Sequence, residues 1–266
     1  MKLQFTKMNG AGNDFVMLDN RNGAIDLGRE DLARLCDRHR GVGADGVLLV
    51  ERGAEGMRMR YFNADGGEAS MCGNGARCFA RYAARLEGEN ESLSFVTGAG
   101  VIHAKLDGEN VSLNMSNPHS WQDARRLKLG SGERDVWSVD TGVPHAVTFV
   151  ENLEALDVAA EGAAIRWHAA FAPNGTNANF VRVESPGHLA IRTYERGVEA
   201  ETLACGTGVC AAALVHAHAS GISGPVEVRV RGGDTLTVFF TRKGADFRDV
   251  VLHGPADFVF DGEISL

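Results

Sequence analysis

Hydrophobic and polar residues alternate in short runs along most of the chain. A period of two sends successive side chains to opposite faces of a strand, and these runs are rich in Val, Phe, Leu and Thr. The pattern therefore predicts short β-strands, with the clearest examples at residues 2–7, 45–52, 57–63, 111–115, 145–150 and 226–231.

Helical periodicity is less frequent along the chain. Residues 29–39 have a leucine-bearing apolar face and are followed by Gly41, which is typical of a helix C-terminus. Residues 152–171 have an interrupted helical pattern that ends before Pro173. We expect one short helix and one broken helical stretch from these two segments.

Two further helices are predicted at residues 75–86 and 208–219, each directly after a Cys-Gly-x-Gly turn. Residues 209–217 are apolar in every direction apart from one histidine. A helix that is apolar all round has to be buried all round. Among so many predicted strands, this indicates a sheet that curls around a central helix.

The two halves of the chain resemble each other. Cys72 and Cys205 lie 133 residues apart in a chain of 266. Residues 60–63 match residues 192–195, and in each half an acidic turn and then Cys-Gly-Asn-Gly or Cys-Gly-Thr-Gly follows. A single long-period repeat of this kind indicates a duplicated domain.

We place the domain boundary near Pro118. The first domain is expected at residues 1–118 with residues 256–266 returning to it, and the second at residues 119–255. Two similar domains that face each other across a cleft would present their cysteine turns to each other.

Composition narrows the function classes. The net charge of -8 and the lack of a basic stripe argue against nucleic acid and anionic membranes as partners. No apolar run is long enough to span a bilayer, and the start has no signal-peptide core. Five cysteines do not form a secreted disulfide framework. We expect a reduced, cytoplasmic enzyme with a small-molecule substrate.

The cysteine turns suggest a specific chemistry. Glycines let the backbone approach a ligand, and the N–H groups that start the following helix attract a carboxylate. The same helix start favours a thiolate over a thiol. Inversion at an α-carbon needs one base on each face, so thiols at Cys72 and Cys205 suit a racemase or epimerase.

The cysteines also allow other interpretations. Cys36, Cys78 and Cys210 are expected to be small buried apolar residues. No Cys-x-x-Cys indicates redox chemistry, and no close-spaced Cys and His indicate a metal, so we predict no metal. A carboxylate-binding module without catalysis stays an alternative, although binding alone does not call for two thiols.

Several motifs resemble those of the diaminopimelate epimerase family over nearly the whole chain. They are Lys7-Met8-Asn9-Gly10-Ala11-Gly12-Asn13-Asp14-Phe15, Arg38-His39-Arg40-Gly41-Val42-Gly43-Ala44-Asp45-Gly46, Phe62-Asn63-Ala64-Asp65-Gly66, Met71-Cys72-Gly73-Asn74-Gly75-Ala76-Arg77-Cys78, Tyr194-Glu195-Arg196-Gly197 and Thr202-Leu203-Ala204-Cys205-Gly206-Thr207-Gly208. The resemblance implies an α+β fold of two homologous domains, each a β-barrel-like mixed sheet around a central helix. It implies interconversion of LL- and meso-diaminopimelate in lysine and cell-wall precursor synthesis, with no cofactor and a homodimer.

The resemblance also implies roles for individual residues. Cys72 and Cys205 would be the acid and base. Backbone N–H groups would hold the reacting carboxylate, the substrate's amino groups and distal carboxylate would meet further polar residues, and other side chains would tune the thiols. The carboxylate-holding positions are Gly73, Asn74, Gly206 and Thr207, the other substrate-binding positions are Asn13, Asn63, Asn177, Glu195 and Arg196, and the tuning positions are His145 and Glu195.

Two positions depart from the family pattern. Val143 replaces an asparagine before Pro144-His145, and Gly46 stands where some members have a substrate-touching glutamine. A proline or hydroxyproline racemase of the same fold is the nearest alternative. Such enzymes have histidine at the position of Asn74, and proline gives Arg196 no distal carboxylate to bind.

Overall fold

The computed structural model describes residues 2–54, 56–88, 91–130 and 132–266. The chain divides into two compact units. Unit 1 consists of Met1–Leu113 and Gly254–Leu266, and unit 2 consists of Asn114–His253. Each unit is described separately below.

Unit 1 is built on a mixed sheet. Its paired strands run in the order β18 (Asp257–Ser265), β1 (Lys2–Gly10), β2 (Asn13–Asp19), β3 (Gly46–Gly53), β4 (Gly56–Asn63), β6 (Ser92–Thr97), β7 (Gly100–Asp107) and β8 (Asn110–Asn114), and β5 (Glu68–Ala69) also pairs with β4. The pairs β2–β3 and β4–β6 are parallel, and the other pairs named here are antiparallel. A parallel pair needs a crossover connection, and a helix lies within each one here.

Unit 2 repeats this order strand for strand. Its sequence of neighbours is β9 (His119–Leu129), β10 (Gly132–Asp140), β11 (Pro144–Phe149), β12 (Asn177–Ser185), β13 (His188–Glu195), β15 (Val226–Arg229), β16 (Thr235–Lys243) and β17 (Asp246–Pro255), with β14 (Ala200–Thr202) on β13. The parallel pairs are β11–β12 and β13–β15, in the same places as in unit 1.

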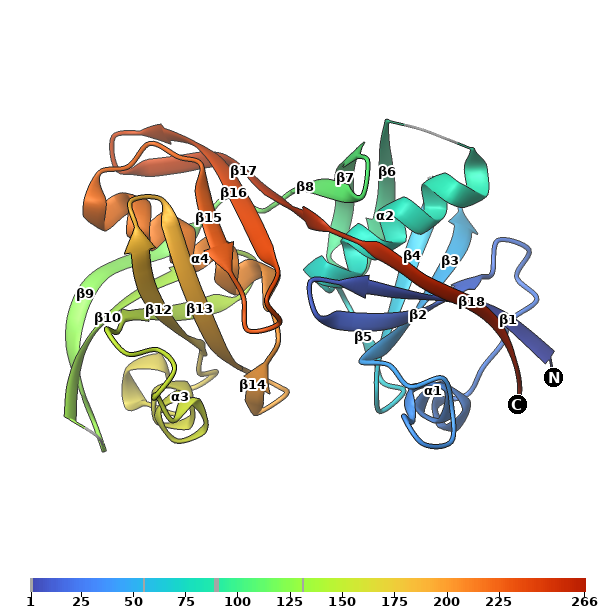
Figure 1. Ribbon diagram of the computed structural model, residues 1–266, viewed down its shortest axis with the longest axis horizontal. Coiled ribbons are helices and arrows are strands. Elements are labelled where there is room, and N and C mark those ends of the chain that lie inside the picture. Colours follow the sequence, from blue (N-terminus) through green and yellow to red (C-terminus); the bar gives the residue numbers. More distant parts are fainter. Residues whose placement is uncertain (1, 55, 89–90, 131) are drawn as a thin grey trace. The chain divides into compact units, whose positions relative to one another are not determined.

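One long helix lies among the strands of each unit (Figure 1). In unit 1, α2 (Gly73–Glu87) contacts β1, β2, β3, β4 and β7. In unit 2, α4 (Gly206–Ser220) contacts β10, β11, β12, β13, β15 and β16. All of α4 from Gly208 to Ala217 is buried, as its uniformly apolar sequence predicted. The predicted α+β class, with a mixed sheet wrapped around a central helix, is confirmed.

The other face of each sheet is covered by a shorter helix. Strand alternation directs Val47 and Leu49 of β3 into a core with α1 (Arg29–Cys36), while Leu48 between them lies near α2. In unit 2, Phe180 of β12 packs in a core with α3 (Val158–Arg166). The helix at each cysteine turn is therefore held against a rigid sheet.

The helix predicted at residues 29–39 is shorter in the structure, because α1 ends at Cys36. The carboxylate of Asp37 accepts the backbone N–H groups of His39 at 2.7 Å and Arg40 at 2.9 Å, which turns the chain away. Gly41 therefore does not end the helix directly. An added Cβ there would lie 1.9 Å from the Arg34 carbonyl oxygen, so Gly41 permits a close backbone approach.

The interrupted pattern at residues 152–171 is confirmed as α3 followed by a short 3-10 helix, η1 (Ala169–Phe171). The side chain of Asp157 caps α3 by accepting the Ala160 N–H at 3.0 Å. Both cysteine-turn helices begin two residues earlier than predicted, at Gly73 and Gly206. The turn forms the first residues of the helix and does not precede it.

A repeated ion pair aligns the two units residue by residue. Arg60 of β4 bonds Glu68 of β5 at 2.9 and 3.0 Å, and Arg192 of β13 bonds Glu201 of β14 at 2.6 and 2.7 Å. When Arg60 and Arg192 are taken as equivalent positions of the two units, the strand registers make four further pairs of positions equivalent. These are Asn63 and Glu195, Gly46 and Asn177, Leu48 and Asn179, and Phe15 and His145.

Candidate active site at two helix starts

Cys72 and Cys205 are the N-cap residues of α2 and α4. Both have extended backbone conformations, with φ of -140° and -128°, and both are half-buried. An N-cap side chain lies next to the positive end of the helix dipole, where a thiolate is stabilised. Cys72 and Cys205 are therefore partly exposed and lie in a favourable electrostatic field.

The other three cysteines are buried, as predicted: Cys36, Cys78 and Cys210. Burial raises the pKa of the Cys36 thiol to about 12 and the pKa of the Cys78 thiol to about 12. These two sulfurs stay protonated thiols at neutral pH and are poor nucleophiles or bases. The two half-buried cysteines are the ones suited to acid–base chemistry.

The backbone at each helix start can hold an anion. The first intrahelical bonds run from Ala76 N–H to the Cys72 carbonyl at 2.8 Å and from Val209 N–H to the Cys205 carbonyl at 2.9 Å. The N–H groups of the preceding residues point out of the helix end and have no acceptor within it. They include the predicted carboxylate-holding positions Gly73, Asn74, Gly206 and Thr207. Each turn can therefore bind one carboxylate oxygen beside a thiol.

Glycines in the turns allow close packing. An added Cβ at Gly208 would lie 2.5 Å from Asn179 Oδ1. At the equivalent Gly75, an added Cβ would lie 3.2 Å from Leu48 and 3.4 Å from Phe15. The helix start in each unit therefore packs against the same strand position, which is the polar Asn179 in unit 2 and the apolar Leu48 in unit 1.

In unit 1 an amide network surrounds the helix start. Asn74 Nδ2 donates to Asn13 Oδ1 at 2.7 Å, and Asn13 Nδ2 donates to Asp45 at 2.9 Å. The buried Arg77 donates to Asn74 Oδ1 at 2.9 Å and to the Pro255 carbonyl at 3.1 Å. The structure therefore brings Asn13 and Asn74 together beside Cys72, with the orientation of both amides fixed by charged partners.

Asp14, the residue after Asn13, belongs to a cluster of charged side chains with Lys7 and Arg38. Arg38 donates to Asp14 at 2.8 and 2.9 Å, and Lys7 lies 2.8 Å from the same carboxylate. Burial acts to raise the pKa of Asp14, but the hydrogen bonds from Arg38 and Lys7 lower that pKa to about 2. Asp14 stays ionised at neutral pH and anchors the turn between β1 and β2.

In unit 2 a buried histidine lies behind the helix start. His145 Nε2 is 2.9 Å from Thr207 Oγ1, and Thr207 Oγ1 is 3.5 Å from Cys205 Sγ. On the other side, Asn179 Nδ2 lies 3.1 Å from His145 Nδ1. Burial and the Arg196 guanidinium lower the pKa of His145 to about 3, so the ring is neutral at physiological pH.

Glu195 is the last residue of β13, and Arg196 follows it. Asn177 is buried, accepts the Arg196 N–H at 2.8 Å and donates to the Pro144 carbonyl at 2.9 Å. The side chain of Asn177 thus fixes the backbone that carries Arg196. Burial raises the pKa of the Glu195 carboxyl. Within the described ranges of the chain, the Arg196 guanidinium has no ion-pair partner, so it is available to a carboxylate ligand.

Two further predicted positions lie at one end of unit 1. Asn63 ends β4, is exposed, and its carbonyl accepts the Gly66 N–H at 2.9 Å. Gly46 lies opposite Asn63 in β3. An added Cβ at Gly46 would lie 2.5 Å from the Phe62 carbonyl oxygen, so this backbone leaves no room for a side chain.

Asn179 is a residue that the sequence interpretation did not single out. It lies in β12, has no exposed surface, and touches His145. The one signal in the sequence is an amide side chain inside the otherwise apolar run Ala178–Val181. Such a buried amide needs partners, but the sequence does not say which.

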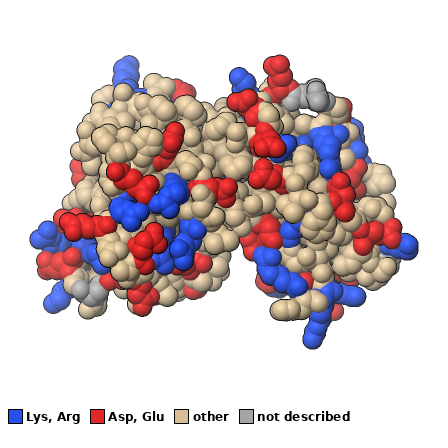
Figure 2. Space-filling model, in the orientation of Figure 1, with Lys and Arg blue, Asp and Glu red and all other residues tan. Residues whose placement is uncertain are grey.

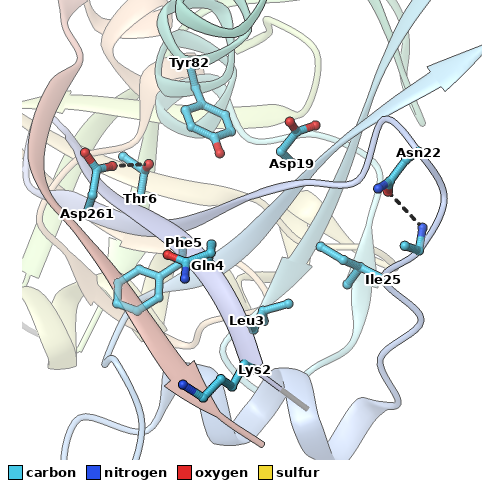
Figure 3. Close-up of a pocket in the computed structure, with 11 residues that line it drawn as sticks. Lys2, Leu3, Gln4, Phe5, Thr6, Asp19, Asn22, Ile25, Tyr82 and Asp261 are labelled. Atoms are coloured by element: carbon cyan, nitrogen blue, oxygen red, sulfur yellow. Dashed lines mark hydrogen bonds between the residues drawn. The ribbon is translucent and has the colours of Figure 1, made fainter.

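A cavity of about 450 Å³ lies elsewhere in unit 1, beside β1 (Figure 3). Its polar lining is partly paired, since Thr6 donates to Asp261 and the Ala24 N–H donates to Asn22 at 3.0 Å. None of the predicted site residues lines it. The cavity is therefore separate from the two cysteine turns.

Other classes of binding partner require a surface stripe of one charge, a membrane-spanning helix or a metal site. Acidic and basic side chains are interspersed on the face seen in Figure 2. None of the helices in the described part of the chain is both long and apolar enough to cross a membrane. Among the described residues, no cluster of three or more His, Cys, Asp and Glu side chains is arranged to hold a metal ion.

Comparison with known proteins identifies the family of this chain. The profile of the diaminopimelate epimerase family matches residues 5–121 and 137–259. The chain belongs to the diaminopimelate epimerase family. It is 43% identical over 265 residues to the diaminopimelate epimerase of Chlorobaculum tepidum, covering 97% of this chain and all of that one. It is 42% identical over 283 residues to that of Nitrosospira multiformis, covering 100% and 99%. The resemblance inferred from the sequence motifs is confirmed.

Solved structures of other proteins share the fold of the family. A phenazine biosynthesis protein of the PhzF family from Bacillus anthracis superposes with a TM-score of 0.77 at 18% identity over the full length of both chains. A hydroxyproline epimerase from Agrobacterium vitis superposes with a TM-score of 0.72 at 16% identity, covering 100% of this chain and 93% of that one. At these identities the likeness shows the fold alone.

Proposed function

We propose that this chain interconverts LL- and meso-2,6-diaminopimelate by a two-base reaction in which Cys72 and Cys205 act on opposite faces of the α-carbon. The observation that carries the proposal is the repeated helix start. In two units with the same strand order, a half-buried cysteine caps a helix whose first N–H groups can hold a carboxylate. Family membership supports the choice of substrate.

The reaction balances without an added reagent. One cysteine, as a thiolate, removes the α-proton and becomes a thiol, while the electron pair of the broken C–H bond is delocalised into the substrate carboxylate. The other cysteine, as a thiol, delivers its proton to the opposite face and becomes a thiolate. The roles exchange for the reverse substrate. The mechanism requires both turns to approach one α-carbon during turnover.

The helix starts supply the main electrostatic stabilisation. Negative charge develops on the carboxylate oxygens as the α-proton leaves, and preorganised N–H donors at Gly73, Asn74, Gly206 and Thr207 stabilise this charge most at that moment. The delocalised carbanion needs no pyridoxal phosphate and no metal under this proposal, because the helix dipoles and N–H groups take that role.

The remaining polar groups fit the rest of diaminopimelate. Arg196, without an ion-pair partner among the described residues, suits the distal carboxylate, and Glu195 beside it suits an ammonium group. Asn13 and Asn63 provide further amide groups for the substrate, while Asn177 holds the backbone of Arg196 in place. His145 acts on Cys205 through Thr207 and not by direct contact.

The proposal is tested by incubating the reduced enzyme with LL-diaminopimelate in deuterated water. We expect one deuterium at the inverted α-carbon and a mixture of LL and meso isomers, measured by chiral chromatography with mass spectrometry. Diaminopimelate that keeps its configuration and gains no deuterium would refute the proposal.

The same assay distinguishes diaminopimelate epimerisation from the nearest alternative activity, which is proline-type racemisation. L-Proline and trans-4-hydroxy-L-proline are run in parallel under identical conditions. Deuterium in either of these, with none in diaminopimelate, would assign the chain to proline-type racemisation. An Arg196→Met variant supplies a further comparison, because only a substrate with a distal carboxylate should lose affinity when this guanidinium is removed.

We further propose that the enzyme acts as a homodimer in the cytoplasm. The two-base reaction needs reduced thiols, which a reducing compartment maintains. Light scattering coupled to size-exclusion chromatography tests the dimer, and a mass equal to one chain across the working concentration range would contradict it.

A further inference from the structure

The buried polar pair behind Cys205 is not required by the fold. His145 and Asn179 have no exposed surface, and the equivalent residues of unit 1 are Phe15 and Leu48, which are also fully buried. The same strand positions can thus be filled by apolar side chains. Burying polar groups costs free energy unless they are hydrogen-bonded, so their presence in unit 2 calls for an explanation beyond packing.

The hydrogen-bond partners fix the orientation of the Asn179 amide. Its Nδ2 lies 2.9 Å from the Ala146 carbonyl oxygen, and its Oδ1 lies 3.0 Å from Thr193 Oγ1. A backbone carbonyl can only accept, so the group facing Ala146 has to be the NH₂. The second hydrogen of this NH₂ is directed at His145 Nδ1, 3.1 Å away.

This orientation in turn fixes the tautomer of His145. Because Nδ1 accepts a hydrogen bond, the proton of the neutral ring lies on Nε2. Nε2 then donates to Thr207 Oγ1 at 2.9 Å. A threonine hydroxyl has one hydrogen, and with its oxygen accepting from His145 that hydrogen is available to Cys205 Sγ at 3.5 Å.

We infer that Asn179 is a positioning residue for epimerisation: it holds His145 in the Nε2–H tautomer, which directs the Thr207 hydroxyl hydrogen at Cys205 Sγ. A donor aimed at sulfur favours the thiolate over the thiol. The inference rests on the proposed function, in which Cys205 alternates between these two forms.

The groups packed around His145 keep this chain of donors constant with pH. Asn179 of β12 and Thr207 of α4 do not titrate. Among the described residues, Arg196 is the charged group that acts on the ring, and together with burial it holds the pKa of His145 at about 3. The ring therefore stays neutral, and keeps the same tautomer, over the pH range in which a cysteine thiol titrates.

The tautomer is tested directly by NMR of the full chain labelled with ¹⁵N-histidine. The His145 signals are assigned by their loss in His145→Gln. We expect a neutral Nε2–H ring that does not titrate between pH 5 and 9. In Asn179→Asp the new carboxylate can accept from Nδ1, so the proton is expected to move to Nδ1. An Nδ1–H tautomer in the parent protein, or titration of His145 near its ordinary pKa, would overturn the inference.

The effect on sulfur is tested by alkylating Cys205 with iodoacetamide as a function of pH, with each cysteine followed by peptide mass spectrometry. Thr207→Val removes the hydroxyl with little change in shape, and we expect Cys205 to be alkylated about tenfold more slowly at pH values below its midpoint. Thr207→Ser keeps the hydroxyl and should restore most of the rate.

Matched controls isolate the donor chain. Thr148→Val makes the same exchange at a buried position of β11, three residues from His145, and should leave the Cys205 rate unchanged. The rate at Cys72 in each sample is an internal reference. Equal Cys205 rates in Thr207→Val and the parent protein would refute the inference. This readout uses no substrate, so it succeeds or fails independently of the deuterium assay.

Discussion

The two cysteine turns differ in what lies behind them. At Cys72 the helix start rests on Phe15 and Leu48, and its Asn74 side chain is held by Arg77 and Asn13. At Cys205 the helix start rests on Asn179, and its Thr207 side chain is held by His145. The backbone of the repeat is the same in both places, but the side chains that reach the turn are different.

The difference shows which features belong to the fold and which to the chemistry. The glycines, the helix start and the N-cap cysteine occur in both units, so they are what the proposed reaction needs twice. The buried histidine and amide occur once. Since the apolar pair in unit 1 supports the same architecture, the polar pair adds a specific electrostatic environment to one thiol.

The largest expected effect comes from removing what both turns share. Cys72→Ala or Cys205→Ala should each lower epimerisation by at least about 10³-fold, because either loss removes an acid or base from one face of the α-carbon. Isomer formation from LL-diaminopimelate measures this. Cys36→Ala, at a buried cysteine outside the turns, is the control and should keep most of the activity. Retained turnover in either turn variant would rule out the two-base reaction.

The next effect comes from giving unit 2 the side chains of unit 1. The double variant His145→Phe and Asn179→Leu should fold, because both partners of a buried polar pair are replaced together. Epimerisation should fall about tenfold to a hundredfold as Cys205 loses its oriented donor. Circular dichroism and the isomer assay measure the two outcomes. Full activity would mean that the polar pair has no part in the reaction.

The reciprocal exchange is expected to affect stability instead. Phe15→His with Leu48→Asn buries two polar groups at positions that are apolar and fully buried in unit 1. The free energy of unfolding should fall by about 2 kcal/mol or more. Urea denaturation measures it. A stability equal to that of the parent would show that unit 1 can satisfy these groups, which would weaken the contrast between the two units.

The sequence predicted the common features of the turns better than their differences. The period-two runs, the apolar helix of unit 2 and the repeated Cys-Gly-x-Gly were enough for the fold class, because each is a local pattern. The same turns distinguished Cys72 and Cys205 from the buried Cys36. The predicted helix ending near His39 was too long, since the side chain of Asp37 closes the turn in a way that periodicity does not register.

The differences depend on contacts between distant segments. Asn179 reaches His145 only because β11 and β12 pair in parallel with one particular register, and no short-range pattern encodes that register. The amide of Asn179 in an apolar strand did not indicate which residue it contacts. In the same way, the sequence did not indicate that the side chain of Asn177 bonds the backbone of Pro144 and Arg196.

A smaller effect is expected from the glycine that touches the polar pair. In Gly208→Ala the new Cβ would lie 2.5 Å from Asn179 Oδ1, so the amide has to move. In Gly75→Ala the nearest atom is the flexible end of Leu48 at 3.2 Å. We expect Gly208→Ala to lower the free energy of unfolding by about 2 kcal/mol and Gly75→Ala by less than half of that. Urea denaturation of both variants measures this, and equal losses would show that the two helix starts are packed alike.

The smallest expected effect is the pH dependence that His145 adds to unit 2. Burial lowers the pKa of His145 from 6.5 to about 3 in the folded protein. Between these values the unfolded chain binds a proton that the folded chain does not, so the contribution of His145 to stability is present above pH 6.5 and is lost as the pH falls. From pH 7 to pH 5.5 this amounts to about 1 kcal/mol.

His145→Phe, which copies Phe15, should lose that much less stability over the same interval when both proteins are unfolded with urea. A Gln substitution at the exposed His103 is the control and should follow the parent. If His145→Phe loses stability in parallel with the parent, then His145 binds its proton as readily in the folded state as in the unfolded chain, and the neutral ring assigned to unit 2 is wrong.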